Sequence, residues 1–254
     1  MIPRELIRAV PKSDLHAHLD GSLRVSTLIE LAREQGVALP SYEETGLRER
    51  VFKPAYANLG EYLQGFQYTC AVLSSFEAME RAAFEMAEDA IAQGTRYLEV
   101  RFAPQLLVAT GEACVQAFKA VSDGLLLAKR RHNLKAEVRA GDDVPFECAI
   151  ICCAMRNFGR GMSAYFDRLL DVLPGMRHKE VLAVASQEAV RAAVKARELH
   201  GIPVTGFDLA GEESGYPAGY HAAAYQEAHR HFIRKTVHAG EAYGPESIYE
   251  AITR

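Results

Sequence analysis

The chain alternates between short apolar strand patterns and longer helical patterns, and this alternation constrains its fold more than any other feature. Strands separated by helices build βαβ units, and the strands of such units lie parallel in one sheet. Residues 37–58 interrupt the alternation with several Pro and Gly breakers and are predicted to be irregular. The predicted strands lie within 13–21, 97–102, 148–155 (with Val138 joined to it), 204–210 and 235–238, and the predicted helices cover 24–35, 59–74, 76–93, 112–132, 179–200, 220–232 and the residues from 246 onward.

Polar residues gather at the ends of several predicted strands, which favours a closed (β/α) barrel over an open sheet. Enzymes with this fold hold their reacting groups at the carboxyl ends of the strands. The sequence has no repeat, no low-complexity segment and no linker rich in Gly, Pro or Ser. We therefore predict an α/β fold of the barrel type in which residues 1–254 form a single domain.

The composition is that of a globular protein and argues against nucleic acid or a membrane as a partner. Hydrophobic residues make up 49% of the 254 residues and charged residues 24%, and the net charge of −4 comes without a basic block. No apolar run is long enough to span a bilayer, and residues 1–11 lack the apolar core of a signal peptide. The five cysteines form no Cys-x-x-Cys pair. We expect a cytoplasmic protein with reduced thiols that binds a small molecule.

The first predicted strand carries an unusual polar face. Because side chains alternate in a strand, Asp14, His16, His18 and Asp20 are predicted to share one face, while apolar residues occupy the other. Imidazole and carboxylate groups are the ligands that zinc and similar divalent ions take. The alternative is a solvated edge strand that carries two histidines by chance, and the His-x-His motif alone does not decide between the two.

A second polar group lies at the end of the last predicted strand, in the segment 236–241 (TVHAGE). His238 is a candidate third ligand, and Glu241 follows where a loop could bring it over the metal. A histidine near a strand end is more often a hydrogen-bonded structural residue, so this pattern is weak by itself. In a closed barrel, however, His238 converges on the same mouth as the His-x-His pair. The joint occurrence predicts a metal site.

Four segments together resemble the adenosine deaminase family of zinc hydrolases: 11–22 (PKSDLHAHLDGS), 97–104 (YLEVRFAP), 207–213 (FDLAGEE) and 236–241 (TVHAGE). Their order and spacing are similar to the family's, and the similarity runs over nearly the whole chain. The resemblance implies a TIM-type (β/α)8 barrel of the metal-dependent hydrolase kind, of which this chain covers about the first five strands. It also implies the hydrolytic deamination of adenosine and 2′-deoxyadenosine to inosine and ammonia.

Carried over to this sequence, the resemblance implies that His16, His18 and His238 hold one zinc ion. Asp208 is similar to a residue that steadies a ligand histidine, which zinc sites usually need, and a buried capping carboxylate is the structural alternative. The zinc deaminases that act on cytosine or on nucleic acid carry a Pro-Cys-x-x-Cys signature. This sequence lacks that signature, so their fold is excluded.

The same resemblance implies contacts with a purine nucleoside. Asp20 would meet a ribose hydroxyl, His18 would lie at the substrate as well as at the metal, and the Gly211 backbone would face the purine edge. Glu241 would donate a proton to the ring nitrogen beside the attacked carbon, since a carboxyl group in a dry pocket can keep its proton near neutral pH. Related adenine-specific deaminases tend to have Glu in the place of Asp20, so the aspartate favours a nucleoside.

The sequence departs from the family by stopping at Arg254, before a His-Gly strand that orients the attacking water and a paired-Asp strand that supplies a further zinc ligand. We expect the natural chain to continue, and a polypeptide that ends there to bind zinc weakly and to lack activity. Three alternatives stay open: a deaminase of adenine or of a modified adenosine, a different metal hydrolase on the same barrel, and an inactive zinc- or nucleoside-binding form. The sequence carries no signal for the oligomeric state.

Overall fold

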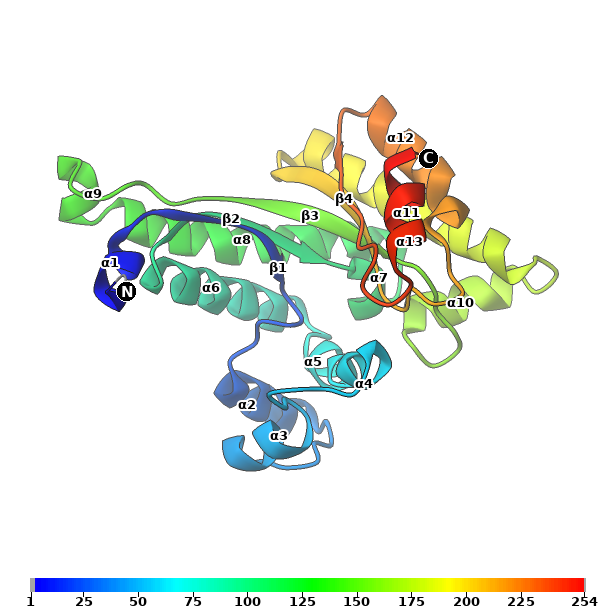
Figure 1. Ribbon diagram of the computed structural model, residues 1–254, viewed down its shortest axis with the longest axis horizontal. Coiled ribbons are helices and arrows are strands. Elements are labelled where there is room, and N and C mark those ends of the chain that lie inside the picture. The colour runs from blue at the N-terminus through cyan, green and yellow to red at the C-terminus, as the bar shows by residue number, and fades with distance from the viewer. Residues whose placement is uncertain (1–2, 254) are drawn as a thin grey trace.

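A five-stranded parallel sheet forms the centre of the protein (Figure 1). The computed structural model describes residues 3–253. The strands are β1 (Lys12–His18), β2 (Thr95–Phe102), β3 (Glu147–Met155), β4 (Val204–Ala210) and β5 (Arg234–Lys235). Each strand pairs in parallel with the next strand along the chain. This arrangement confirms the predicted fold class and places the carboxyl ends of the strands along one edge of the sheet.

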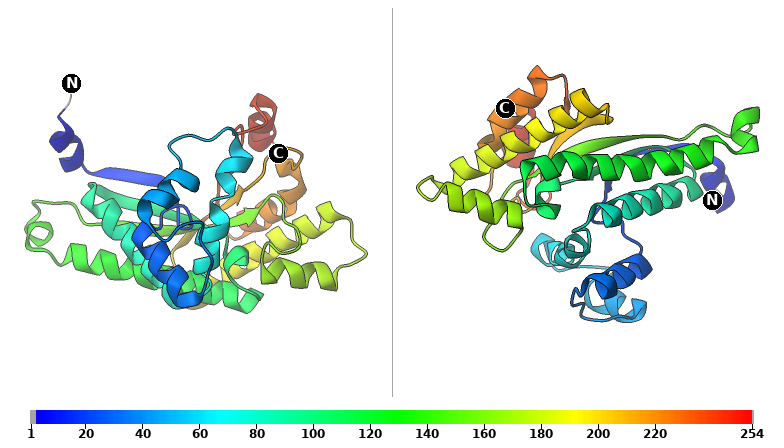
Figure 2. Two further views of the ribbon diagram at one scale, coloured as in Figure 1. Left: turned by 90° about the horizontal axis from the view of Figure 1, so that it is seen from below. Right: turned by 180° about the vertical axis from the view of Figure 1, so that it is seen from behind.

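Helices connect the strands and cover one face of the sheet. Figures 1 and 2 show α6 and α8 side by side along this face, and α11 packs against β3 and β4. None of the helices within residues 3–253 is long and apolar enough to cross a membrane. The helices are α1 (Arg4–Ala9), α2 (Val25–Gln35), α3 (Glu44–Arg50), α4 (Leu59–Leu63), α5 (Phe66–Val72), α6 (Phe76–Ala92), α7 (Pro104–Leu107), α8 (Gly111–Asn133), α9 (Ala136–Ala140), α10 (Ala164–Val172), α11 (His178–His200), α12 (Ala222–Arg230) and α13 (Pro245–Thr253), with a 3-10 turn η1 (Ala218–His221) before α12.

The face of β2 that meets the helices is apolar. Leu98, Val100 and Phe102 are buried there, and the Phe102 ring contacts Phe118 of α8 edge-on with centroids 5.3 Å apart. Burying side chains of this size contributes about 1.5–3 kcal/mol each. The residues between them, Arg101 among them, face the opposite side of the sheet. One strand therefore serves both the hydrophobic core and the polar side of the sheet.

β1 contains a bulge that interrupts the alternation of its sequence. The register advances by three residues on β1, from Asp14 to Ala17, but by only two residues on β2. Asp14 and Ala17 therefore both lie beside residues of β2 that face the helices. The Asp14 carboxylate accepts a hydrogen bond from the backbone N–H of His16 (3.1 Å). Asp14 is therefore not on the face that carries His16 and His18, contrary to the prediction. An extra residue in a strand re-aims the side chains that follow it.

Short helices account for the other differences from the sequence predictions. The predicted helix 59–74 is broken at residues 64–65 into α4 and α5, and α3 lies within the segment that was predicted to be irregular. Val138, which was predicted to extend the third strand, lies in α9. Helices of five to seven residues depend on tertiary packing rather than on periodicity, as the fully buried Leu47 of α3 illustrates.

Candidate metal centre

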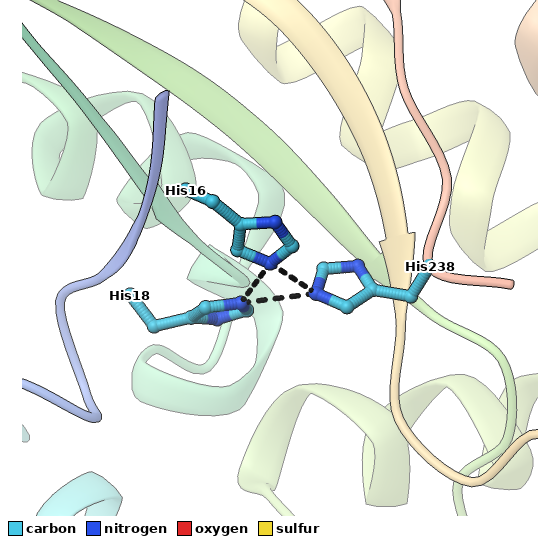
Figure 3. Close-up of side chains that lie close together, drawn as sticks. All are labelled: His16, His18 and His238. Carbon is cyan, nitrogen blue, oxygen red and sulfur yellow. Dashed lines mark hydrogen bonds between the residues drawn. The ribbon is translucent and has the colours of Figure 1, made fainter. Parts of the chain in front are cut away.

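Three histidine rings meet at the carboxyl ends of β1 and β5 (Figure 3). The Nε2 atom of His16 lies 2.8 Å from that of His238 and 3.3 Å from that of His18. The His18 and His238 Nε2 atoms are 3.1 Å apart. The structure thus brings together the three histidines that the sequence singled out, although His16 and His238 are separated by 222 positions.

The backbone next to β4 brings His238 to this position. The paired part of β5 covers two residues, where 235–238 was predicted. The chain nevertheless continues beside β4, because the Thr236 N–H donates to the Phe207 carbonyl (2.9 Å) and the His238 N–H donates to the Leu209 carbonyl (3.1 Å). These two hydrogen bonds extend the sheet pattern as far as the histidine, so the strand prediction was right about direction and wrong about its regular extent.

Asp208 contacts the far side of the His238 ring. Its Oδ2 atom lies 3.0 Å from His238 Nδ1, and the carboxylate is fully buried within β4. A proton on Nδ1 leaves the lone pair of Nε2 directed toward the other two rings. Burial opposes the charged form of His238, but the Asp208 carboxylate outweighs it and raises the pKa of the imidazole, which makes His238 a more basic ligand.

Arg101 joins Asp208 to β1. Its Nη1 atom donates to Asp208 Oδ2 (2.8 Å) and its Nη2 atom donates to the Leu15 carbonyl (2.6 Å), inside the β1 bulge. Both members of the ion pair are buried. Burial raises the pKa of Asp208, but His238 and Arg101 outweigh it and hold this pKa below its ordinary value. Asp208 therefore stays a carboxylate that can accept from the His238 ring.

The donor set fits a divalent metal ion such as zinc. Burial, the neighbouring imidazoles and Arg101 lower the pKa of His16 and bring that of His18 to about 4, so both rings are neutral at pH 7. A neutral imidazole offers one nitrogen lone pair to a metal ion, and three ring nitrogens within 3.3 Å of one another leave each other poorly satisfied. Three histidines are an established ligand set for catalytic zinc.

A pocket of about 1080 Å³ opens over the histidines. The other sequence-predicted residues that line it are Asp20, Gly211 and Glu241, while Asp208 is buried behind His238. Much of the remaining wall is apolar and comes from α4, α5 and the segments that follow β2 and β3. The apolar residues of this wall include Leu59, Leu63, Phe66, Leu106, Leu107 and Phe158.

Asp20 presents an oxygen without a hydrogen-bond partner at this pocket, with His18 Nδ1 3.9 Å away from it. The residue is 8% exposed, and its Oδ1 atom has no hydrogen-bond partner among the described residues, while Oδ2 accepts from the Cys70 thiol (3.8 Å). Burial raises the pKa of Asp20 to about 6 against the opposing hydrogen bonds. A buried oxygen without a partner is costly, so a ligand hydroxyl that donates to Oδ1 would remove this cost.

The backbone conformation at residue 211 requires glycine. Its φ angle is +100°, and a Cβ atom at this position would lie 2.9 Å from the terminal carbon of Met155. Residues with a side chain rarely adopt such a φ. The absence of a side chain also leaves the Gly211 backbone at the wall of the pocket, so the structural reason and the predicted contact with a ligand are compatible.

Glu241 lines the pocket but is not in dry surroundings. It lies three residues after His238, near enough for its charge to act on the imidazoles of His16 and His238, and its side chain is exposed. The dry environment that was expected to keep a proton on this carboxyl group is therefore not formed by residues 3–253.

Three buried charged residues next to the site received no role from the sequence: Arg101, Arg156 and Glu213. Their polar partners are far away along the chain, up to 107 positions for Arg101 and 82 for Arg156, so no local spacing announces them. Arg101 and Glu213 do lie inside two of the four quoted segments. Their place within these segments was the signal that could have found these two residues, and Arg156 lies outside the four segments.

Comparison with known proteins supports the same family. A family model described as adenosine deaminase matches residues 11–165 and 153–254. An adenosine deaminase of Mycolicibacterium gilvum is 34% identical over 250 residues, which cover 98% of this chain and 59% of the relative. The chain spans between 28% and 59% of the length of the first curated relatives that it matches.

Solved structures share the fold. An N6-methyl-AMP deaminase from Arabidopsis thaliana is 22% identical with a TM-score of 0.70, and the match covers 98% of this chain and 64% of that one. An amidohydrolase from Burkholderia ambifaria, solved with bound Zn, is 20% identical with a TM-score of 0.68 over 98% of this chain and 58% of that one. With the family model matched along nearly its whole length, the chain belongs to the adenosine deaminase family.

Proposed function

We propose that this chain carries the metal-binding and nucleoside-binding part of a hydrolase that converts adenosine and 2′-deoxyadenosine to inosine and ammonia. One zinc ion per chain, held by His16, His18 and His238, belongs to the proposal. The observation that carries it is the meeting of three Nε2 atoms at a pocket that also presents Asp20, Gly211 and Glu241. The single-domain organisation and the cytoplasmic location inferred from the sequence stay predictions.

Each polar group of the pocket has a task in this chemistry. A zinc ion held by His16, His18 and His238 would supply Lewis-acid activation of the attacking water at neutral pH. Glu241 donates a proton to the ring nitrogen beside the carbon that bears the amine, which makes this carbon electrophilic. The Gly211 N–H donates to the purine edge, and Asp20 Oδ1 accepts from a ribose hydroxyl. Water replaces the amine, which leaves as ammonia.

The pocket favours a nucleoside over a nucleotide. Proteins bind phosphate groups chiefly with Arg, Lys and helix N-termini. In the part of the chain that the structure describes, no Arg or Lys lines the pocket, whereas Asp20, Glu212 and Glu241 do. These carboxylates would repel a phosphate. Adenine and modified adenosines stay open as alternative substrates.

Substrate choice is tested by ammonia release from adenosine, 2′-deoxyadenosine, adenine, N6-methyladenosine and AMP. We expect kcat/KM for the two unmodified nucleosides to exceed that for adenine by at least about 10²-fold, because adenine leaves the buried Asp20 oxygen unpaired. AMP is expected to be the poorest nucleoside derivative. Equal efficiency with AMP would contradict the proposed preference.

The metal and the proton donor are tested separately. The His16→Ala/His18→Ala double variant is expected to lose zinc in elemental analysis, while His229→Ala, which removes an exposed histidine of α12, keeps it. Glu241→Gln should keep zinc and nucleoside binding, while turnover falls on the order of 10²-fold. Stoichiometric zinc in the double variant would rule out the site, and near-normal turnover would remove Glu241 from the mechanism.

A second candidate function is zinc- and nucleoside-binding without turnover. The exposure of Glu241 favours it, since residues 3–253 do not enclose this carboxyl group in the way expected of a proton donor in a closed active site. Adenosine binding measured by calorimetry, in the absence of ammonia release, would select this candidate over the deaminase.

A further inference from the structure

Arg156 and Glu213 are a pair of buried charges behind the segment that carries Glu241. Arg156 is fully buried directly after β3, and Glu213 is 4% exposed three residues after β4. Arg156 Nη2 lies 4.0 Å from Glu213 Oε1. Neither residue lines the pocket. Burying two charges is costly unless each finds enough partners, so the contacts of each residue indicate what the pair does.

Arg156 binds the beginning of the segment. Its Nη2 atom donates to the carbonyl of His238, and its Nη1 atom donates to the carbonyl of Tyr216 (2.7 Å). Its own backbone N–H donates to the Ala210 carbonyl (2.8 Å), which fixes Arg156 to the end of β4. The planar guanidinium thus ties the backbone of the third histidine to the neighbouring strand.

Glu213 binds the rest of the segment. Its Oε1 atom accepts from the Gly240 N–H (2.7 Å) and from the Ser247 hydroxyl, and its Oε2 atom accepts from the N–H groups of Ala242 (2.7 Å) and Tyr243 (3.0 Å). Burial raises the pKa of Glu213, but these hydrogen bonds outweigh it and lower the pKa to about 2. One carboxylate therefore satisfies three backbone donors of the loop after His238 and the Ser247 hydroxyl of α13.

The residues on both sides of Glu241 are held in this way, while its own side chain is exposed. Gly240 and Gly244 have φ angles of +83° and +98°. Without hydrogen bonds to hold it, a loop with two such glycines could adopt many backbone conformations. Charge-assisted hydrogen bonds are about twice as strong as neutral ones. The loop is thus flexible by sequence and ordered by one buried carboxylate.

We propose that Arg156 and Glu213 are positioning residues that hold the segment 238–247 and thereby fix Glu241 relative to His238. The inference rests on the proposed function in one respect, that Glu241 is the proton donor. A misplacement of about 1 Å can cost on the order of 10²-fold in rate, so a donor on an exposed loop needs such an anchor.

The test uses the 254-residue chain and its Glu213→Gln variant, in which an amide replaces the carboxylate among four donors. Hydrogen exchange at pH 7 is measured at Gly240, Ala242 and Tyr243. We expect exchange there to become at least about 10-fold faster, as the loss of charge-assisted hydrogen bonds predicts. The matched control is Glu85→Gln. Glu85 is also buried and accepts from a hydroxyl and an arginine, but it lies in α6, away from the site.

The control separates a local anchor from general stability. Glu85→Gln is expected to lower the melting temperature without changing exchange at the three amides. Unchanged exchange in Glu213→Gln, or equal acceleration in both variants, would overturn the proposal. If Glu213→Gln does not fold, Ser247→Ala removes only one of the four donors, and about 3-fold faster exchange at Gly240 is then expected.

A kinetic readout distinguishes positioning from structure alone. In a zinc-loaded chain that deaminates adenosine, Glu213→Gln should lower kcat by at least about 10-fold. KM should stay within about 2-fold of the parent value, because ground-state binding does not use Glu241. Faster exchange with unchanged kcat would overturn the positioning role. If the parent chain releases no ammonia while the exchange result holds, the anchoring of the loop stands. The proposed function fails if the longer natural chain also releases no ammonia.

Discussion

The two halves of the histidine cluster are held in different ways. His16 and His18 extend from β1, which pairs with β2 in the part of the chain that the structure describes, and His16 is exposed. His238 is held by the buried Asp208 at its ring and by the buried Arg156 at its carbonyl. Burial lowers the pKa of His18 to about 4, whereas Asp208 raises that of His238. The β4–β5 half is thus preorganised by buried charges, and the β1 half by backbone pairing and a bulge.

The largest expected difference between the halves is in the cost of removing one carboxylate. Asp208→Asn leaves the buried Arg101 without its counter-ion, and we expect a loss of about 3–5 kcal/mol in the free energy of unfolding. Asp14→Asn on the β1 half keeps an acceptor for the His16 N–H and should cost no more than about 0.5 kcal/mol. Urea unfolding of the metal-free variants measures both, and equal losses would abolish the distinction.

Acid should weaken the β4–β5 half through Glu213. Its pKa is lowered to about 2 in the folded chain, from an ordinary value near 4.5. Its stabilisation is therefore complete above pH 4.5 and is lost as the pH falls from there through about 2. A shift of this size corresponds to about 3 kcal/mol.

The measurement is the difference in free energy of unfolding between the parent chain and Glu213→Gln, taken at several pH values. This difference should be largest near neutral pH and shrink as acid is added below pH 4.5. A difference that stays constant from pH 7 to pH 2.5 would show that the charge of Glu213 does not contribute.

The smallest effects come from two glycines, one in each half. Gly211→Ala forces a side chain onto a φ of +100° and against Met155, so we expect a loss of about 1–3 kcal/mol. Gly21, which follows Asp20, has no positive φ, and its added Cβ would meet neighbours at an ordinary 3.5 Å. Gly21→Ala should change stability by less than about 0.5 kcal/mol. Thermal unfolding of both variants checks the order, and a reversed order would contradict it.

Sequence reasoning was most successful where the pattern is long or the chemistry unusual. The strand 204–210 has the predicted bounds, and the helix predicted at 179–200 differs from α11 by one residue, because a mostly buried strand and a helix of many turns both carry strong patterns. The bulge in β1 was missed because Asp14 bonds to the backbone two residues on, an interaction that alternation does not encode. α10 was also missed, although Ser163 at its N-cap accepts from the Phe166 N–H.

The sequence predicted which residue types form the site, but not the buried residues that hold them in place. The histidines and Glu241 were singled out because the residue types and motifs are specific, and the role of Glu241 stays a prediction. Arg156 and Glu213 act through backbone atoms of a distant loop, and any sequence offers those atoms at every position. No residue pattern can therefore mark their partners, and only the folded chain identifies them.

The order of the strands has a consequence for how the chain is made. Sheet neighbours are also successive strands, so during synthesis each new strand finds its partner already present, and the sheet can grow from the N-terminus outward. The histidine cluster is different, because His238 emerges 220 residues after His18. Loop closure over that distance is delayed until β5 docks. A cation held by all three histidines therefore cannot guide the early steps of folding, because the third histidine reaches the site only once β5 is in place.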